Sequence, residues 1–130
     1  MTPSVPLDAD LRERKILIVD DDDGFIQVAQ AVLEGEGVTV AGVAHNSAEA
    51  VQRTQALRPD VVLIDIRLGR ESGFEAARRL ADNGYPAALI MISAHAGEEY
   101  AELIAESPAI GFLPKVELSA EAIRRLLGAG

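Results

Sequence analysis

Residues 15–21 read Lys-Ile-Leu-Ile-Val-Asp-Asp, an unbroken apolar run that ends at two carboxylates. Most of its apolar residues are β-branched, which favours a strand. Apolar side chains at every position, rather than at alternate positions, indicate a strand that is covered on both faces, as in a parallel sheet. The same pattern returns in residues 61–65, Val-Val-Leu-Ile-Asp. We therefore predict two buried strands of a parallel sheet, each ending at an acidic residue.

Shorter apolar runs and helical patterns alternate on either side of these two strands. We expect strands at residues 16–19, 38–44, 61–64, 87–92 and 110–113, and helices near residues 25–33, 47–57, 74–81, 100–107 and 120–127. The first helix has apolar residues at the spacing of one helical face, which are Phe25, Val28, Ala29, Val32 and Leu33. Candidate N-caps precede three of the helices, namely Asp22 or Asp23, Asn46 or Ser47, and Ser119.

Five strand–helix repeats predict an α/β fold in which helices cover both faces of a parallel sheet. Residues 1–14 carry two prolines and mixed charges without periodicity, and we interpret them as a flexible arm. Residues 15–130 then form one domain, a size at which a chain buries enough surface to fold without disulfides or metals.

Composition excludes several classes of protein. Twelve basic residues against 21 acidic ones give a net charge of −9, which argues against direct binding to nucleic acid. The chain has no cysteine, so disulfides, thiolate catalysis and cysteine-based zinc sites are excluded. No apolar run approaches the ~18 residues that a membrane-spanning helix needs.

Ligands of open parallel sheets bind beyond the carboxyl ends of the strands, where the strand order reverses. The residues that directly follow the predicted strands there are three carboxylates, a hydroxyl and an ammonium: Asp20, Asp21, Asp65, Ser93 and Lys115. Neither a dinucleotide-binding nor a P-loop glycine motif is present. The candidate chemistry therefore rests on these five side chains.

Clustered carboxylates need a cation, because two like charges about 4 Å apart repel by roughly 4 kcal/mol at an effective dielectric of 20. Carboxylate oxygens favour Mg²⁺, which keeps further positions for water and phosphate oxygens. A carboxylate beside such an ion can attack phosphorus and form an aspartyl-phosphate. An ammonium and a hydroxyl, as in Lys115 and Ser93, can stabilise the charge of the transferred group.

With these residues in place, the chain resembles the receiver domain of two-component response regulators. The resemblance covers about residues 15–127 and rests on the segments KILIVDD, DVVLIDIRLGRESGFEAARRL, ALIMISA and GFLPK. It implies a flavodoxin-like, doubly wound sheet with strand order 2-1-3-4-5. It also implies a bacterial, cytoplasmic signalling protein that catalyses only its own phosphorylation and slow dephosphorylation.

The resemblance also assigns roles to single residues. Asp65 corresponds to the phospho-acceptor, Asp21 to a direct Mg²⁺ ligand and Asp20 to a ligand acting mainly through water. The backbone carbonyl of Arg67 would be a further ligand. Lys115 would pair with the phosphoryl group.

Ser93 corresponds to the switch hydroxyl, and Phe112 to the aromatic side chain whose rotamer reports activation. Two positions depart from the family pattern, because Gly69 and Val116 stand where proline is usual. We expect the Lys115–Val116 peptide bond to be trans, since a cis bond before a non-proline residue costs about 2.5–4 kcal/mol.

The expected function is a phosphorylation-dependent switch, with a sensor histidine kinase or a phosphotransfer protein as donor. We expect a stand-alone receiver that signals through its fourth helix, fifth strand and fifth helix, with Arg124 and Arg125 as candidate contacts and a possible homodimer on phosphorylation. Alternatives are the receiver part of a longer DNA-binding regulator, a Mg²⁺-dependent phosphatase, and a binding-only pseudo-receiver. The phosphatase needs an acid two residues after the nucleophile, where this chain has Arg67.

Overall fold

The computed structural model describes residues 14–84, 86–95 and 97–129. Apart from Arg14, the predicted N-terminal arm lies outside the described residues. Strands and helices alternate along the chain, as expected. The larger elements are β1 (Lys15–Val19), α2 (Asp23–Gly35), β2 (Thr39–Ala44), α3 (Ser47–Leu57), β3 (Val61–Asp65), α4 (Gly73–Asp82), β6 (Ala88–Ser93), α5 (Ala101–Glu106), β7 (Gly111–Pro114) and α6 (Ala120–Ala129).

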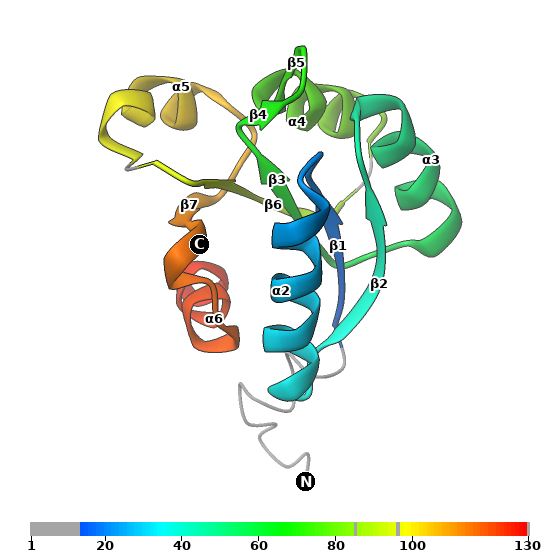
Figure 1. Cartoon of the computed structure of the whole chain (residues 1–130). Coiled ribbons are helices and arrows are strands. Elements are labelled where there is room, and N and C mark those ends of the chain that lie inside the picture. The colour runs from blue at the N-terminus through cyan, green and yellow to red at the C-terminus, as the bar shows by residue number, and fades with distance from the viewer. Residues whose placement is uncertain (1–13, 85, 96, 130) are drawn as a thin grey trace, which may run out of the picture.

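The main sheet has five parallel strands in the order β2-β1-β3-β6-β7, which confirms the predicted topology. The order reverses at β1, so the carboxyl ends of β1 and β3 lie next to each other. Helices α2 and α6 cover one face of the sheet, while α3, α4 and α5 lie on the other (Figure 1). The chemistry predicted at the strand ends is therefore gathered at one edge.

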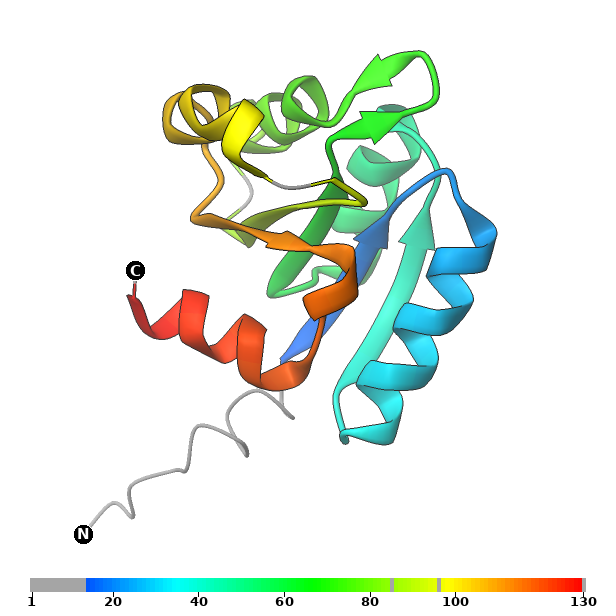
Figure 2. The same cartoon turned by 60° about the vertical axis from the view of Figure 1, so that its left-hand side comes forward.

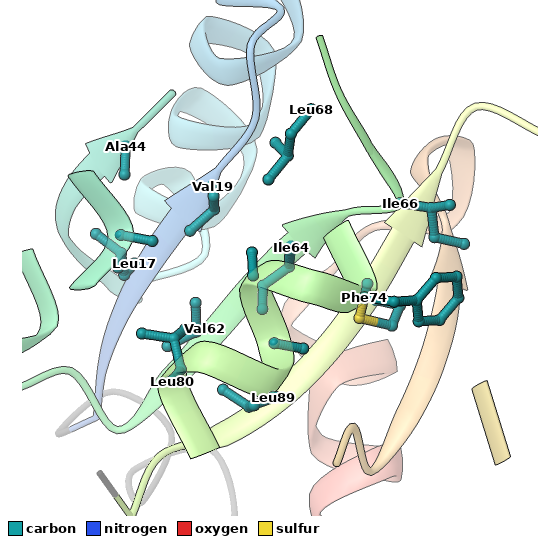
Figure 3. Packing of buried hydrophobic residues seen from close by; sticks show 14 residues of the cluster. Leu17, Val19, Ala44, Val62, Ile64, Ile66, Leu68, Phe74, Leu80 and Leu89 are labelled. Carbon is teal, nitrogen blue, oxygen red and sulfur yellow. The ribbon is translucent and has the colours of Figure 1, made fainter. Parts of the chain in front are cut away.

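The unbroken apolar strands place side chains in the apolar core on both faces of the sheet. Alternate residues of β1, such as Ile16 and Ile18, pack beneath α2 and α6. Their neighbours Leu17 and Val19 pack on the opposite face, in the cluster that α4 covers (Figure 3). This double burial explains why neither β1 nor β3 shows an alternating pattern.

The prediction of which residues form the inner face of α2 is partly wrong. Ile26, Ala29 and Leu33 are its buried residues, whereas Val28 is 60% exposed and Val32 is 38% exposed. The sheet and α6 cover only a narrow stripe of this helix, and the apolar spacing in the sequence is wider than that stripe.

Side-chain caps fix where the helices begin. Asp22 caps α2 by accepting the N–H groups of Gly24 and Phe25, and Asn46 caps α3. The Ser119 hydroxyl accepts the Ala122 N–H at the start of α6. These contacts resolve the alternatives that the sequence left open at the first two helices. No helix in the described part of the chain is long and apolar enough to cross a membrane.

A feature absent from the sequence prediction follows β3. The segment between β3 and α4 contains a two-stranded antiparallel ribbon, in which β4 (Arg67–Leu68) pairs with β5 (Glu71–Ser72). Figure 2 shows this ribbon standing beyond the carboxyl edge of the main sheet. Gly69 lies in its turn with φ +60°, a left-handed conformation closed to proline, whose ring holds φ near −65°. The departure from the family pattern at this position therefore has a structural reason.

Candidate functional site

Asp20 lies just past the end of β1 and is fully buried. Its N–H donates to the carbonyl of Ala44 at 2.9 Å, which continues the pairing with β2. Its Oδ1 accepts the Asp22 N–H at 2.9 Å, which turns the chain into α2. Asp21, between them, is exposed. The β1–α2 turn thus presents the buried carboxylate of Asp20 next to the exposed one of Asp21.

Asp65 is the last residue of β3 and is 7% exposed. Its Oδ1 accepts the Arg67 N–H at 3.1 Å. The chain returns close by, because the Gly73 N–H donates to the Ile66 carbonyl at 2.7 Å. A Cβ at position 73 would lie 1.9 Å from the Asp65 carbonyl oxygen, so only glycine fits there. The start of α4 therefore holds the backbone of Asp65.

The ammonium of Lys115 lies between the two buried carboxylates. Its Nζ is 2.7 Å from Asp20 Oδ2 and 3.0 Å from Asp65 Oδ2. It also lies 4.3 Å from the centroid of the Phe25 ring. Burial lowers the pKa of Lys115, but the hydrogen bonds to Asp20 and Asp65 outweigh it and raise the pKa above its usual value. The lysine is therefore a charged part of the site, held by both carboxylates.

Asp20 bears the largest electrostatic cost at this edge of the sheet. Its pKa is raised to about 6, mainly by burial and in addition by the charge of Asp65, while the hydrogen bonds from Lys115 and the Asp22 N–H oppose the rise. Two buried carboxylates thus share a single ammonium. The cluster is short of positive charge.

A divalent cation fits this donor set. Oxygen atoms of Asp20, Asp21 and Asp65 all lie within 4.8 Å of one another. All three are hard carboxylate ligands, the kind that Mg²⁺ prefers. Arg67 begins β4 beside them, with its side chain exposed and its N–H bonded to Asp65. The role of its carbonyl remains a prediction.

The remaining predicted residues lie on β6 and β7. Ser93 is 3% exposed at the end of β6, and its hydroxyl accepts the His95 N–H at 3.1 Å. Phe112 is half-buried and packs against the apolar cluster beneath α4. Pro114 pairs with Ser93 on the edge strand, where the missing N–H is tolerated. The Lys115–Val116 bond is trans, which confirms that prediction.

Two polar networks near the site have no local signal in the sequence. The His45 ring contacts Asp23 at 3.0 Å and Glu49 at 3.1 Å, so this histidine joins the first turns of α2 and α3. In the other network, Glu71 of β5 accepts both the N–H and the hydroxyl of Ser47. Ser47 in turn accepts a hydrogen bond from Arg79 at 3.0 Å.

Comparison with known proteins agrees with this geometry. The family model of the response regulator receiver domain matches residues 16–127. A protein-glutamate methylesterase/protein-glutamine glutaminase of Pyrococcus horikoshii is 35% identical over 107 residues, which are 80% of this chain and 29% of that protein. The DNA-binding response regulator MtrA of Mycolicibacterium smegmatis is 33% identical over 118 residues, 90% of this chain and 50% of that protein. The chain thus spans half or less of these two relatives.

A solved response regulator from Burkholderia pseudomallei is also similar. Its TM-score is 0.75 at 26% identity, over 88% of this chain and 66% of that one. That crystal structure is described as holding a phosphorylated aspartic acid, a calcium ion and citrate.

Proposed function

The chain belongs to the response regulator receiver domain family, and on that premise we propose that it is a signalling switch phosphorylated on Asp65. The observation that carries this proposal is the setting of Asp65, whose Oδ2 lies 3.0 Å from an ammonium while its carboxylate belongs to a three-aspartate cluster. A phosphorylated aspartic acid and a divalent ion in the similar Burkholderia pseudomallei protein support it.

The donor is a sensor histidine kinase or a phosphotransfer protein. A carboxylate oxygen of Asp65 attacks phosphorus, so that an O–P bond forms as the donor's N–P bond breaks, and the leaving imidazole nitrogen takes up a proton. Bound Mg²⁺ would supply positive charge at the phosphoryl oxygens. Asp20, Asp21 and Asp65 with the Arg67 carbonyl would hold it. Lys115 is placed to shift from the free carboxylate towards the new phosphoryl group.

The readout passes through Ser93 and Phe112 to the surface of α5, β7 and α6. Ser93 lies at the buried end of β6, and Phe112 lies on the neighbouring β7, which gives a short physical path. Arg124 and Arg125 of α6 are candidate partner contacts, although Arg125 also pairs with Glu121 of its own helix. Phosphorylation shifts a pre-existing equilibrium, and the output is a changed protein contact, including possible homodimerisation.

We propose a cytoplasmic receiver that acts on no substrate but itself. The chain spans half of MtrA, a DNA-binding response regulator, and the receiver part of a longer DNA-binding regulator is therefore one form that this switch could take. Reading the coding sequence around the receiver tests this form. A continuation into a basic helical domain would support it, and a stop codon directly after the receiver would refute it.

Incubation with a small-molecule phosphodonor and Mg²⁺, followed by intact mass, tests the proposal. The wild type should gain one phosphoryl group that maps to Asp65, and Asp65→Ala should gain none. Asp21→Ala should lose both Mg²⁺ binding and phosphorylation, whereas Lys115→Ala should accept phosphate but switch poorly. A phosphopeptide around another aspartate, or full labelling of Asp21→Ala, would overturn the assignment.

A further inference from the structure

The β4–β5 ribbon connects both sides of the candidate metal site. It leaves directly from Asp65, whose Oδ1 accepts the Arg67 N–H at the first residue of β4. Its turn reaches the other side, because a Cβ at Gly69 would lie 3.5 Å from Asp21 Oδ2. The backbone of this ribbon therefore runs along the carboxylates that would hold a cation.

The ribbon alone is too small to hold this position. It consists of two residue pairs, Arg67 with Ser72 and Leu68 with Glu71. Isolated two-stranded hairpins are marginally stable at best, and a glycine in the turn adds conformational entropy that ordering must remove. Buried Leu68 provides one anchor on the domain. A second anchor is needed on β5.

Glu71 supplies that second anchor. Its Oε1 accepts the Ser47 N–H at 2.9 Å, and its Oε2 accepts the Ser47 hydroxyl. Ser47 is buried in the first turn of α3, and its hydroxyl accepts a hydrogen bond from Arg79 of α4. A carboxylate with two hydrogen bonds from one residue is held in both position and orientation. Glu71 thus ties the ribbon to two helices of the domain.

We propose that Glu71 is a positioning residue for the metal site, because its contacts with Ser47 fix the β4–β5 ribbon beside Asp21 and Asp65. This inference rests on the proposed function in taking Mg²⁺ as the ligand and the Arg67 carbonyl as one of the groups that bind it. Glu71 touches neither the ion nor the phosphoryl group in this account. It acts by holding the Arg67 backbone in the conformation that binds.

Linkage makes the effect reciprocal. If the tie between Glu71 and Ser47 favours Mg²⁺ binding, then Mg²⁺ must strengthen that tie by the same factor. The Ser47 N–H, which donates to Glu71, is a direct reporter of it. Its hydrogen exchange should therefore slow when Mg²⁺ is added, without any phosphodonor.

A Mg²⁺ titration of the ¹⁵N-labelled chain, followed by amide resonances, measures the Kd for Mg²⁺. Hydrogen exchange of the same sample reports the protection of the Ser47 amide. In Glu71→Ala the Kd for Mg²⁺ should rise about tenfold, as for other residues that orient metal ligands. Glu71→Gln keeps one acceptor for the Ser47 N–H and should fall in between. Glu102→Ala, which removes an exposed carboxylate from α5, is the matched control and should bind as the wild type does. Unchanged affinity in Glu71→Ala, with the Ser47 amide no longer protected, would overturn the inference.

Phosphorylation kinetics separate a positioning role from a general structural one. In Glu71→Ala the Mg²⁺ concentration for half-maximal rate should rise about tenfold, while the rate at saturating Mg²⁺ stays at the wild-type value. A lower plateau with unchanged half-saturation would contradict the inference. If Glu71→Ala does not fold, Ser47→Ala removes the hydroxyl with its contacts to Glu71 and Arg79 but keeps the N–H contact, and it should show a smaller rise in Kd. No rise in Kd would contradict the inference.

The same experiment distinguishes the two proposals. Wild-type chain that binds Mg²⁺ but is not phosphorylated refutes the proposed function, while the affinity of Glu71→Ala still decides the positioning role. Wild-type chain that binds no Mg²⁺ refutes both.

Discussion

Helices α4 and α5 lie on the same face of the sheet but are attached to it very differently. Five of the ten residues of α4 are buried, and its first residue contacts the backbone of Asp65. In α5, none of the six residues, all of them described, is buried, and Leu103 is 50% exposed. Its region contacts the cluster mainly through half-buried Tyr100 and Ile104, with the Tyr100 ring 6.4 Å from that of Phe74.

This contrast suits two different roles, because α4 holds the candidate site in place and α5 belongs to the proposed readout surface. An element that positions reacting groups must not move, and α4 is fixed by apolar burial close to Asp65, the proposed acceptor. An element that changes contacts must move at little cost in free energy, and regions with few buried apolar contacts open most easily. The looser attachment of α5 supports its place in the proposed readout surface.

Among these variants, Gly73→Ala should destabilise the attachment of α4 most severely. The new Cβ would meet the Asp65 carbonyl carbon and oxygen, which are backbone atoms that can yield only if β3 and α4 separate. We expect a loss of more than about 4 kcal/mol in the free energy of unfolding, in the range reserved for severe clashes. Gly128→Ala, where no atom lies within 4 Å, should be neutral or slightly stabilising. Urea denaturation measures both, and similar stabilities for the two variants would contradict the tight approach.

Truncating one leucine on each helix sharpens the comparison. Leu80 of α4 is buried, so Leu80→Ala should lower the free energy of unfolding by about 2–5 kcal/mol. Leu103 of α5 is half exposed, and Leu103→Ala should cost less than about 1 kcal/mol. Equal losses in thermal or urea unfolding would mean that α5 is as firmly packed as α4.

A third test concerns the buried charge of Asp20 at the carboxyl edge of the sheet, above the apolar core. Burial raises the pKa of Asp20 to about 6, so ionising this carboxyl destabilises the folded state. The cost is absent below the unfolded pKa near 3.8, grows as pH rises towards 6 and is complete above it. Asp20→Asn should therefore stabilise the metal-free chain by up to about 3 kcal/mol at pH 7.

That gain should vanish towards pH 4. Urea unfolding in EDTA across this pH range measures the difference, with Asp82→Asn on the exposed end of α4 as control. A gain that is independent of pH would show that the charge of Asp20 is not its source.

The sheet and the site residues were predictable because their signals are local. Each unbroken apolar run ends at or near a polar residue of the candidate site, so a pattern of a few residues predicts both the strand and the candidate residue at its end. Parallel pairing then gathers Asp20, Asp65, Ser93 and Lys115 at one edge, although the chain separates them widely. The sheet topology therefore explains why these four residues lie close together.

What the sequence could not predict depends on contacts between distant segments. The β4 and β5 strands have two residues each, too few for any periodicity. The contacts of Ser47 with Glu71 and Arg79 join residues 24 and 32 positions apart, without a motif. The exposure of Val28 depends on how narrow a stripe of α2 its neighbours cover.

The position of Lys115 has a consequence for how the site meets its surroundings. An ammonium tethered 2.7 Å from Asp20 and 3.0 Å from Asp65 has an effective local concentration that dilution, dialysis and chelators leave unchanged. Any dissolved cation must compete with this built-in counterion. The site therefore keeps one of its counter-charges when the surrounding metal concentration falls, and its metal occupancy should follow that concentration without the fold depending on it.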